Sequence, residues 1–346
     1  MNLIKAAFDA FFIDDRSAGS LLLNRNNNNP VFSNDGMMCT SMVYDILSAY
    51  SPSKNVANTL RTLVRGGKIV TDDLLLNKLK AARLVSANND LTTIGYCKAI
   101  ELLPLNEQLE ILKLSKVAIE LSGSQPIGGI EKEAANYHSK QGSIAIFNEG
   151  RVFKDAIKAC IAQNLSRFES LGVHPNWFNK TKIDNPEIYP IRIRTFYTGL
   201  IINALGIEKI DDQLAEHRRL TIDTFNSSFN DMATQDILKG FETIWSLEPQ
   251  LKDSLEDIEK IIHGMKIRGF RETVSNFTEE GFSLGSWPDL VIYDPSTKTM
   301  ALSEVKYKRD KLRCNQIYFY LNCYPKVSNV FSEYRIEVPV YIQQGD

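Results

Sequence analysis

The sequence has few of the residues from which zinc centres and disulfide frameworks are built. It contains five cysteines and four histidines in 346 residues. The cysteines lie far apart, none belongs to a C-x-x-C pair, and the histidines do not supply the spacing of a zinc site. We therefore expect reduced thiols, buried as small apolar side chains in a compartment where disulfides do not persist.

The sequence also lacks an excess of basic charge. Its 40 lysines and arginines are balanced by 42 aspartates and glutamates, which gives a formal net charge of −2 and a pI of about 6.2. Any contact with nucleic acid must therefore come from local basic patches. The first 15 residues include three aspartates and no long apolar run. This is the pattern of neither a signal peptide nor a membrane span, and we expect a cytoplasmic protein.

What the sequence does contain is a two-stranded pattern over Trp287–Lys306. Leu290–Tyr293 is a short apolar run that favours a strand. Asp294–Lys298 has the composition of a turn. Met300–Lys306 then follows as a second strand, so the stretch predicts a hairpin.

This hairpin is expected to bring two carboxylates and one amine together. Side chains alternate along a strand, so Glu304 and Lys306 point to one face and Val305 to the other. Asp289, at the start of the first strand, can approach the same point. Two carboxylates can hold a hard divalent cation such as Mg²⁺, and the lysine can orient a water or offset charge that develops on a phosphate. The pattern is typical of metal-assisted phosphodiester hydrolysis, although a surface hairpin with scattered charges is the alternative.

The pattern resembles the PD-(D/E)XK nuclease superfamily, whose motif is matched by Pro288-Asp289 and Glu304-Val305-Lys306. Two further stretches resemble the VRR-NUC subgroup of that superfamily. Upstream, Ile130–Gly142 is similar to its opening helix, and Asn148–Phe153 to its E-G-x-x-F signature. Downstream, Arg309–Leu312 followed by Gln316 is similar to its D-x-L…Q continuation. The resemblance covers roughly residues 128–342.

The resemblance implies a role for each matching residue. Asp289, Glu304 and Glu149 would bind one or two Mg²⁺ or Mn²⁺ ions, and the Val305 backbone carbonyl would complete the metal shell. Lys306 would position the attacking water, with Gln316 reaching the same catalytic site. Without the resemblance, Glu149 is an ordinary acidic residue before a helix, and Gln316 an ordinary exposed glutamine.

The wide separation of Glu149 from Asp289 is similar to the Fanconi-associated (FAN-type) branch, in which a helical segment is inserted between them. Here the insert would be about residues 170–283. This resemblance implies a structure-selective endonuclease that acts on branched or 5′-flap DNA in repair or recombination. The sequence departs from the branch at Tyr307-Lys308, where Gly-Pro is usual, and has no long helical repeat array.

The N-terminal third resembles a winged-helix domain. Helices are expected over Met38–Ala49, Asn55–Arg65, Asp72–Ala82 and Thr92–Leu103, and the two strands of a wing around Asn88-Asn89. Such a domain places a helix in the major groove and its wing on the backbone. Its phosphate-contact candidates are Arg61, Arg65, Lys68, Lys78, Lys80 and Arg83, and a second basic group beside the metal site is Lys308, Arg309, Lys311 and Arg313. The alternative is a winged helix that only contacts protein.

We therefore predict an α/β protein with a restriction-endonuclease-like mixed sheet, a large helical insert and a mostly helical winged-helix domain in front. The domains would be 1–121 and 128–346, joined by a glycine-rich linker, with a helix over Leu105–Leu121. The core strands would be Ile144–Phe147, Leu290–Tyr293, Met300–Lys306 and Tyr334–Ile342. Pro339 predicts an edge position for the last of them.

Three other functions fit the sequence. One is a prophage or defence nuclease that cuts duplex DNA by the same chemistry. The second is a catalytically inactive DNA-binding module with a nuclease fold, against which the intact Asp289, Glu304 and Lys306 argue. The third is an RNA nuclease, because the catalytic chemistry does not distinguish the two backbones.

Overall fold

The structure of the protein, a computed structural model, describes most of the chain. The described residues are 52–68, 73–81, 84–122, 129–147, 151–164, 166–167, 212–247, 255–280, 287–308 and 310–342. The predicted helix Met38–Ala49 and the predicted metal ligand Glu149 lie outside them, as do Arg83 and Arg309.

A five-stranded mixed sheet forms the centre of the fold, and its strand order is β1-β5-β4-β3-β2. The parallel pairs are β1 with β5 and β5 with β4, and the antiparallel pairs are β4 with β3 and β3 with β2. Four of the five strands confirm the predicted ranges, and the α/β class is confirmed. The bounds are β1 Ser115–Ser122, β2 Ile144–Phe147, β3 Leu290–Asp294, β4 Thr299–Val305 and β5 Glu333–Ile342.

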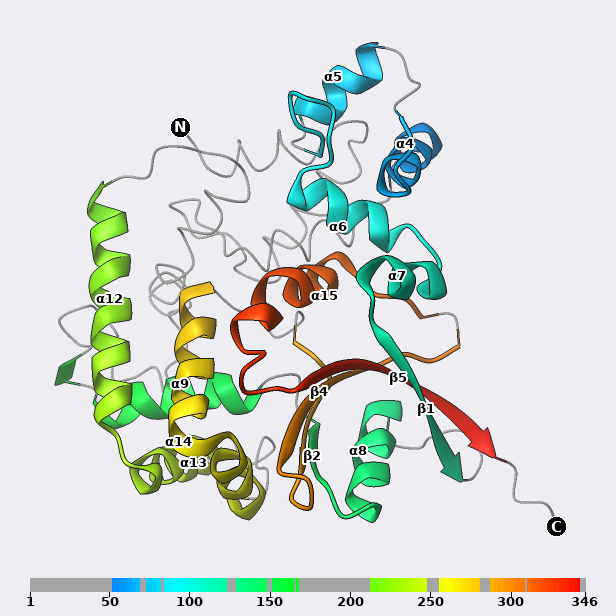
Figure 1. Cartoon of the computed structure of the whole chain (residues 1–346). Helices are drawn as coiled ribbons and strands as arrows, with labels where there is room; N and C mark the ends of the chain where they lie inside the picture. Colours follow the sequence, from blue (N-terminus) through cyan, green and yellow to red (C-terminus); the bar gives the residue numbers. More distant parts are fainter. Residues whose placement is uncertain are drawn as a thin grey trace.

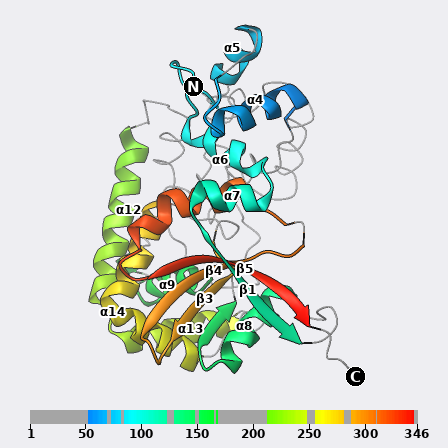
Figure 2. The ribbon, with the colours of Figure 1, turned by 45° about the vertical axis from the view of Figure 1, so that its right-hand side comes forward.

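The two faces of the sheet are covered by different helices (Figures 1 and 2). Helix α8 (Ile130–Lys140) packs on one face through Ala134 and Ala135, against Ile119, Ile292 and other apolar side chains. The opposite face joins the larger core cluster, to which the helices between β2 and β3 contribute. Alternation along β4 follows from this arrangement, because Val305 packs in the α8 cluster and its neighbours Glu304 and Lys306 point away from it.

The helices between β2 and β3 pack through a chain of aromatic rings. Phe229 lies against Phe270 with centroids 6.2 Å apart, Phe270 against Phe153 at 5.8 Å, and Phe153 stacks on Trp287 at 4.7 Å. These buried rings connect helices that are far apart in sequence to Trp287, which lies two positions before Asp289. The described helices between β2 and β3 are α9 Arg151–Gln163, α12 Asp212–Asp231, α13 Thr234–Leu247 and α14 Leu255–Glu280. The last three lie within residues 170–283, and their assignment as an insert in a nuclease fold stays a prediction.

The N-terminal helices stand above the sheet, beyond α15 (Cys314–Tyr318) (Figures 1 and 2). The ranges of α4, α5 and α6 agree with the prediction to within two residues, and Val85 and Leu91 form an antiparallel β-bridge where the wing was predicted. Gly95 is required there, because an added Cβ would meet the Leu84 carbonyl oxygen at 1.8 Å. The winged-helix assignment itself stays a prediction. The helices are α4 Lys54–Val64, α5 Asp73–Ala81, α6 Thr93–Glu101 and α7 Leu105–Leu112.

The predicted helix over Leu105–Leu121 is wrong in its second half. Helix α7 ends at Leu112, its C-cap Lys113 has a left-handed φ of 55°, and the chain continues as strand β1. Val117, Ile119 and Leu121 alternate toward α8, which is the period of a strand. The sheet thus takes a strand from before the predicted linker, so the division into 1–121 and 128–346 stays a prediction about chain organisation.

The edge position predicted from Pro339 is wrong for the strand as a whole, because β5 lies between β1 and β4. Strand β4 nevertheless ends at Val305, which pairs with Glu337. Beyond that point β5 pairs with β1 only, and Pro339 lies opposite Ile119. The proline is therefore at a local edge, where its missing N–H can be tolerated.

Candidate catalytic site

Strand pairing brings Asp289 next to the end of β4. Leu290 lies opposite Ser303 in the antiparallel β3–β4 pair, so the residue before Leu290 lies near Glu304 and Val305. The backbone N–H of Val305 donates a hydrogen bond of 2.8 Å to Oδ2 of Asp289. The aspartate is thereby fixed to the strand that carries the second carboxylate, as the sequence predicted.

Glu304 and Lys306, both buried, and the half-buried Gln316 form a polar cluster joined by hydrogen bonds. The Lys306 ammonium donates to Glu304 Oε1 at 2.6 Å and to Gln316 Oε1 at 3.1 Å. The Gln316 amide nitrogen also donates to Glu304 Oε1. Glu304 is 1% exposed and Lys306 is 8% exposed, so these bonds are little weakened by solvent.

Neighbouring backbone holds this cluster in position. The N–H of Lys306 donates to the Glu337 carbonyl at 2.8 Å, and the N–H of Arg313 donates to Gln316 Oε1 at 3.0 Å. Gln316 therefore has two roles, because its side chain caps the start of α15 and also reaches the carboxylate and the amine.

Asp289 is a largely buried carboxylate that lies near the negative charge of Glu304. Burial, and then the charge of Glu304, raise the pKa of Asp289 to about 9, against the opposing effects of Lys306 and the Val305 N–H. Without a bound cation the carboxyl is therefore protonated at neutral pH. A cation placed between the two carboxylates would replace that proton, so this donor set fits a hard divalent metal.

This environment predicts a pH-dependent stability for the metal-free protein. The pKa of Asp289 is raised from 3.8 to about 9, so between these values the folded state holds a proton that the unfolded state has released. The free energy of unfolding then falls as pH rises across that window. Between pH 6 and pH 8 we expect wild type in EDTA to lose about 2–3 kcal/mol more than Asp289→Asn, measured by urea unfolding.

Magnesium provides the control for this pH experiment. A cation that binds the folded protein offsets the cost of ionising Asp289, so Mg²⁺ is expected to reduce the difference between wild type and Asp289→Asn. Parallel pH profiles of the two proteins in EDTA would contradict the assigned environment of Asp289.

Two residues near the carboxylates were not found from the sequence. The charge of Glu131, in the first turn of α8, also raises the pKa of Asp289. Burial, followed by the charges of Glu304 and Asp289, raises the pKa of Tyr334 on β5, whose hydroxyl has no hydrogen-bond partner among the described residues. The register places Tyr334 opposite Leu302, on the face of the sheet that Glu304 shares. Only the strand order could have revealed this tyrosine.

The structure does not show a complete set of the predicted metal ligands among the described residues. The third predicted metal ligand, Glu149, lies outside the described residues, and no group of three His, Cys, Asp or Glu suited to a metal occurs within them. Metal binding by Asp289, Glu304 and the Val305 carbonyl therefore stays a prediction.

The predicted DNA-contact residues differ in their exposure and in the contacts that they already make within the protein. Arg61 donates to the Leu102 carbonyl at 3.2 Å, and Arg65 pairs with Glu107 at 2.6 Å. Lys80 is half-buried, and nothing is described for the side chain of Lys78. The exposed candidates are Lys68, Lys308, Lys311 and Arg313, and the Lys308 ammonium also lies 4.6 Å from the ring centre of Tyr307. Their role in binding DNA stays a prediction.

A search for membrane spans over the described residues found no helix with the length and hydropathy needed to cross a bilayer. No family model and no curated protein matches the sequence.

Solved structures that resemble this chain include two crystal structures of paFAN1. One is bound to 5′-flap DNA with a 2-nucleotide flap and a gap. It has a TM-score of 0.49 at 12% identity, and the match covers 95% of this chain and 54% of that chain. The other is bound to 5′-flap DNA with a 1-nucleotide flap and a gap. Its TM-score is 0.45 at 12% identity, with 87% and 52% covered. The chain thus spans about half the length of these proteins.

Proposed function

We propose that this protein is a metal-dependent DNA endonuclease of the PD-(D/E)XK type, which hydrolyses phosphodiester bonds. The observation that carries this proposal is the convergence of Asp289, Glu304, Lys306 and Gln316 on one end of the central sheet. A purely structural ion pair would require only Glu304 and Lys306. The second carboxylate raises the local electrostatic cost, which is a common feature of sites that bind cations or move protons.

In this proposal the residues divide the chemical work. Asp289 and Glu304, with Glu149 and the Val305 carbonyl, would hold Mg²⁺ or Mn²⁺. When bound, that ion would supply Lewis-acid polarisation of the phosphodiester and a lower pKa for the attacking water. Lys306 orients the attacking water and offsets charge on the phosphate, and Gln316 fixes the position of the Lys306 ammonium through its 3.1 Å bond.

The substrate class is proposed from the sequence resemblance to the FAN-type branch, which favours branched or 5′-flap DNA and a role in repair or recombination. The winged-helix-like segment and the exposed basic residues Lys308, Lys311 and Arg313 would contact the backbone. Cleavage of duplex DNA by a defence nuclease, binding without cleavage, and RNA cleavage are the competing functions. Binding without cleavage would give no cleavage product, and an RNA nuclease would give RNA products only, so both can be distinguished from our proposal by measurement.

A labelled substrate panel tests the proposal. It contains single-stranded DNA, linear duplex, a 5′ flap, a 3′ flap, a four-way junction and single-stranded RNA, each with Mg²⁺, Mn²⁺ or EDTA. We expect metal-dependent cutting of the 5′ flap to be the fastest reaction, with none in EDTA, because without a cation nothing at the site would polarise the phosphodiester or lower the pKa of the attacking water. Product sizes on denaturing gels report the cut position.

Each other pattern in the panel selects a competing function. Cutting of linear duplex alone favours the defence nuclease, and cutting of RNA alone favours the ribonuclease. Binding of the flap without cleavage under any metal would overturn the catalytic proposal and favour the binding module.

A further inference from the structure

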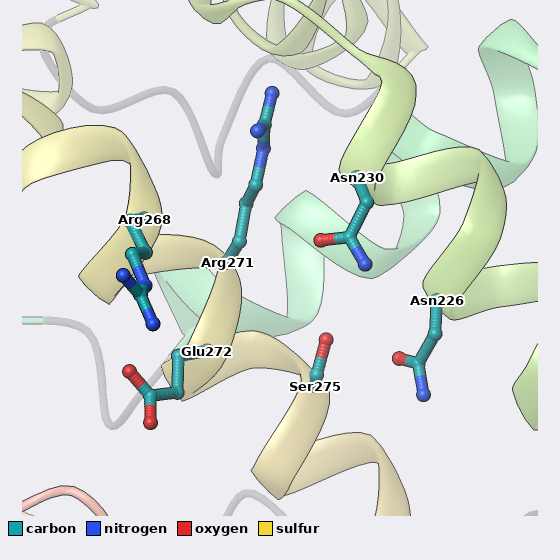
Figure 3. A pocket seen from close by; sticks show the side chains of 6 residues that line it. All are labelled: Asn226, Asn230, Arg268, Arg271, Glu272 and Ser275. Carbon is teal, nitrogen blue, oxygen red and sulfur yellow. The ribbon is translucent and has the colours of Figure 1, made fainter.

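A polar pocket lies between two helices of the segment that precedes β3. Its volume is about 530 Å³. Figure 3 shows its two walls, with Asn226 and Asn230 on α12 and the remaining side chains on α14. The lining residues are Asn226, Asn230, Arg268, Arg271, Glu272 and Ser275. None of them belongs to the catalytic cluster or to the predicted DNA contacts.

The pocket carries positive charge that the described part of the protein does not neutralise. Neither Arg268 nor Arg271 forms an ion pair with a carboxylate among the described residues. One guanidinium nitrogen of Arg271 donates to the Met232 carbonyl, and its Nε has no acceptor within the described residues. Glu272, the one acidic lining residue, accepts a hydrogen bond of 3.3 Å from the Asn329 amide. Two guanidinium groups against one carboxylate leave a net charge of about +1 at the pocket.

The chemistry of the lining selects the class of ligand. Guanidinium, amide and hydroxyl groups line the pocket, and these groups offer more hydrogen-bond donors than acceptors. A divalent cation needs several oxygen anions, which a single glutamate does not supply. A phosphate group, with its oxyanions and its preference for arginine, fits this donor set. We propose that this pocket binds a phosphate group, supplied either by the backbone of a nucleic acid or by free phosphate or a mononucleotide.

The pocket is held firmly relative to the catalytic site. Its α14 wall carries Phe270 on the buried side, between Gly269 and Arg271, and Phe270 contacts Phe153, which stacks on Trp287. Trp287 lies two residues before Asp289. A phosphate bound between α12 and α14 would therefore be fixed in position relative to the carboxylates. The nucleic-acid source rests on the proposed function, whereas the affinity for phosphate does not.

The test measures binding without cleavage. Fluorescence anisotropy in EDTA follows a labelled 5′-flap DNA over a range of salt concentrations, for wild type, Arg268→Gln and Arg268→Gln/Arg271→Gln. Lys239→Gln is the matched control, because it removes one exposed charge from the neighbouring helix α13. We expect the double variant to raise Kd about 10-fold and to reduce the slope of log K against log salt by about 1, whereas the control changes neither.

A second arm distinguishes the two sources of phosphate. Thermal unfolding is compared in inorganic phosphate and in sodium chloride of equal ionic strength. A phosphate-dependent rise in Tm that is lost in the double variant, together with unchanged DNA binding, assigns the pocket to free phosphate. Loss of DNA affinity assigns it to the nucleic-acid backbone.

The proposal is overturned if the arginine variants match Lys239→Gln in both arms. Should the double variant fail to fold, Arg268→Gln alone decides, because this exposed side chain has no hydrogen bond or ion pair among the described residues. Since both arms are independent of cleavage, a wild-type protein that cuts nothing would overturn the proposed nuclease function and leave this result standing.

Discussion

Asp289→Asn is expected to lower the rate of metal-dependent cleavage by about 10³-fold or more. The substitution keeps the size of the side chain, and its amide oxygen can still accept the 2.8 Å bond from the Val305 N–H. It removes one of the two charges that would hold the cation. Single-turnover cleavage of the best substrate in the panel measures the loss.

The same substitution is expected to leave the protein at least as stable as wild type in EDTA. Burial and the charge of Glu304 raise the pKa of Asp289, which means that its ionised form is disfavoured in the fold. A residue that costs stability but is required for activity is the pattern expected of a functional site rather than of a structural one. Urea unfolding of both proteins at pH 8 measures the difference.

Asp257→Asn provides the control for these measurements. Asp257 is half-buried on α14, 4.0 Å from the Lys260 ammonium, and its replacement by asparagine removes the same charge away from the site. Its activity should equal that of wild type. Full activity in Asp289→Asn would sink the catalytic assignment, and equal loss in both variants would show that the effect arises from net charge alone.

The strands were predictable because their signals are local. Alternating or continuous apolar runs, separated by turn residues such as Asp294–Lys298, fixed β3 and β4, and the period of two placed Glu304 and Lys306 on one face. Gln316 was placed only through the family resemblance, and its hydrogen bonds to Glu304 and Lys306 now give that placement a geometric basis.

What could not be predicted depends on contacts between distant segments. Strand β1 follows α7 without a glycine or proline between them. The helix is terminated by Lys113 in a left-handed conformation, which no sequence pattern predicts. Glu131 and Tyr334 approach the carboxylates because of the strand order and the position of α8. The polar pocket likewise exists only because α12 and α14 pack side by side.

Gln108→Leu is expected to reduce the free energy of unfolding by about 3–5 kcal/mol. Gln108 is 0% exposed and joins α7 to the segment before α15. Its amide nitrogen donates to the Ile100 carbonyl at 2.9 Å and to the Leu312 carbonyl at 3.1 Å, and its oxygen accepts from the Leu312 N–H at 2.8 Å. Leucine has a similar size but would leave three buried backbone groups without this partner.

Urea unfolding of Gln108→Leu, with Gln235→Leu as the control, tests this expectation. Gln235 is exposed on α13, so its replacement should change stability by no more than about 0.5 kcal/mol. A loss of less than about 1 kcal/mol for Gln108→Leu would mean that the N-terminal helices and α15 are joined mainly by apolar contacts.

The expected larger loss has a consequence for function. The segment anchored by Gln108 leads directly to Arg313, whose N–H holds Gln316 against Lys306, so the N-terminal helices support the geometry of the catalytic cluster from 204 residues away in sequence.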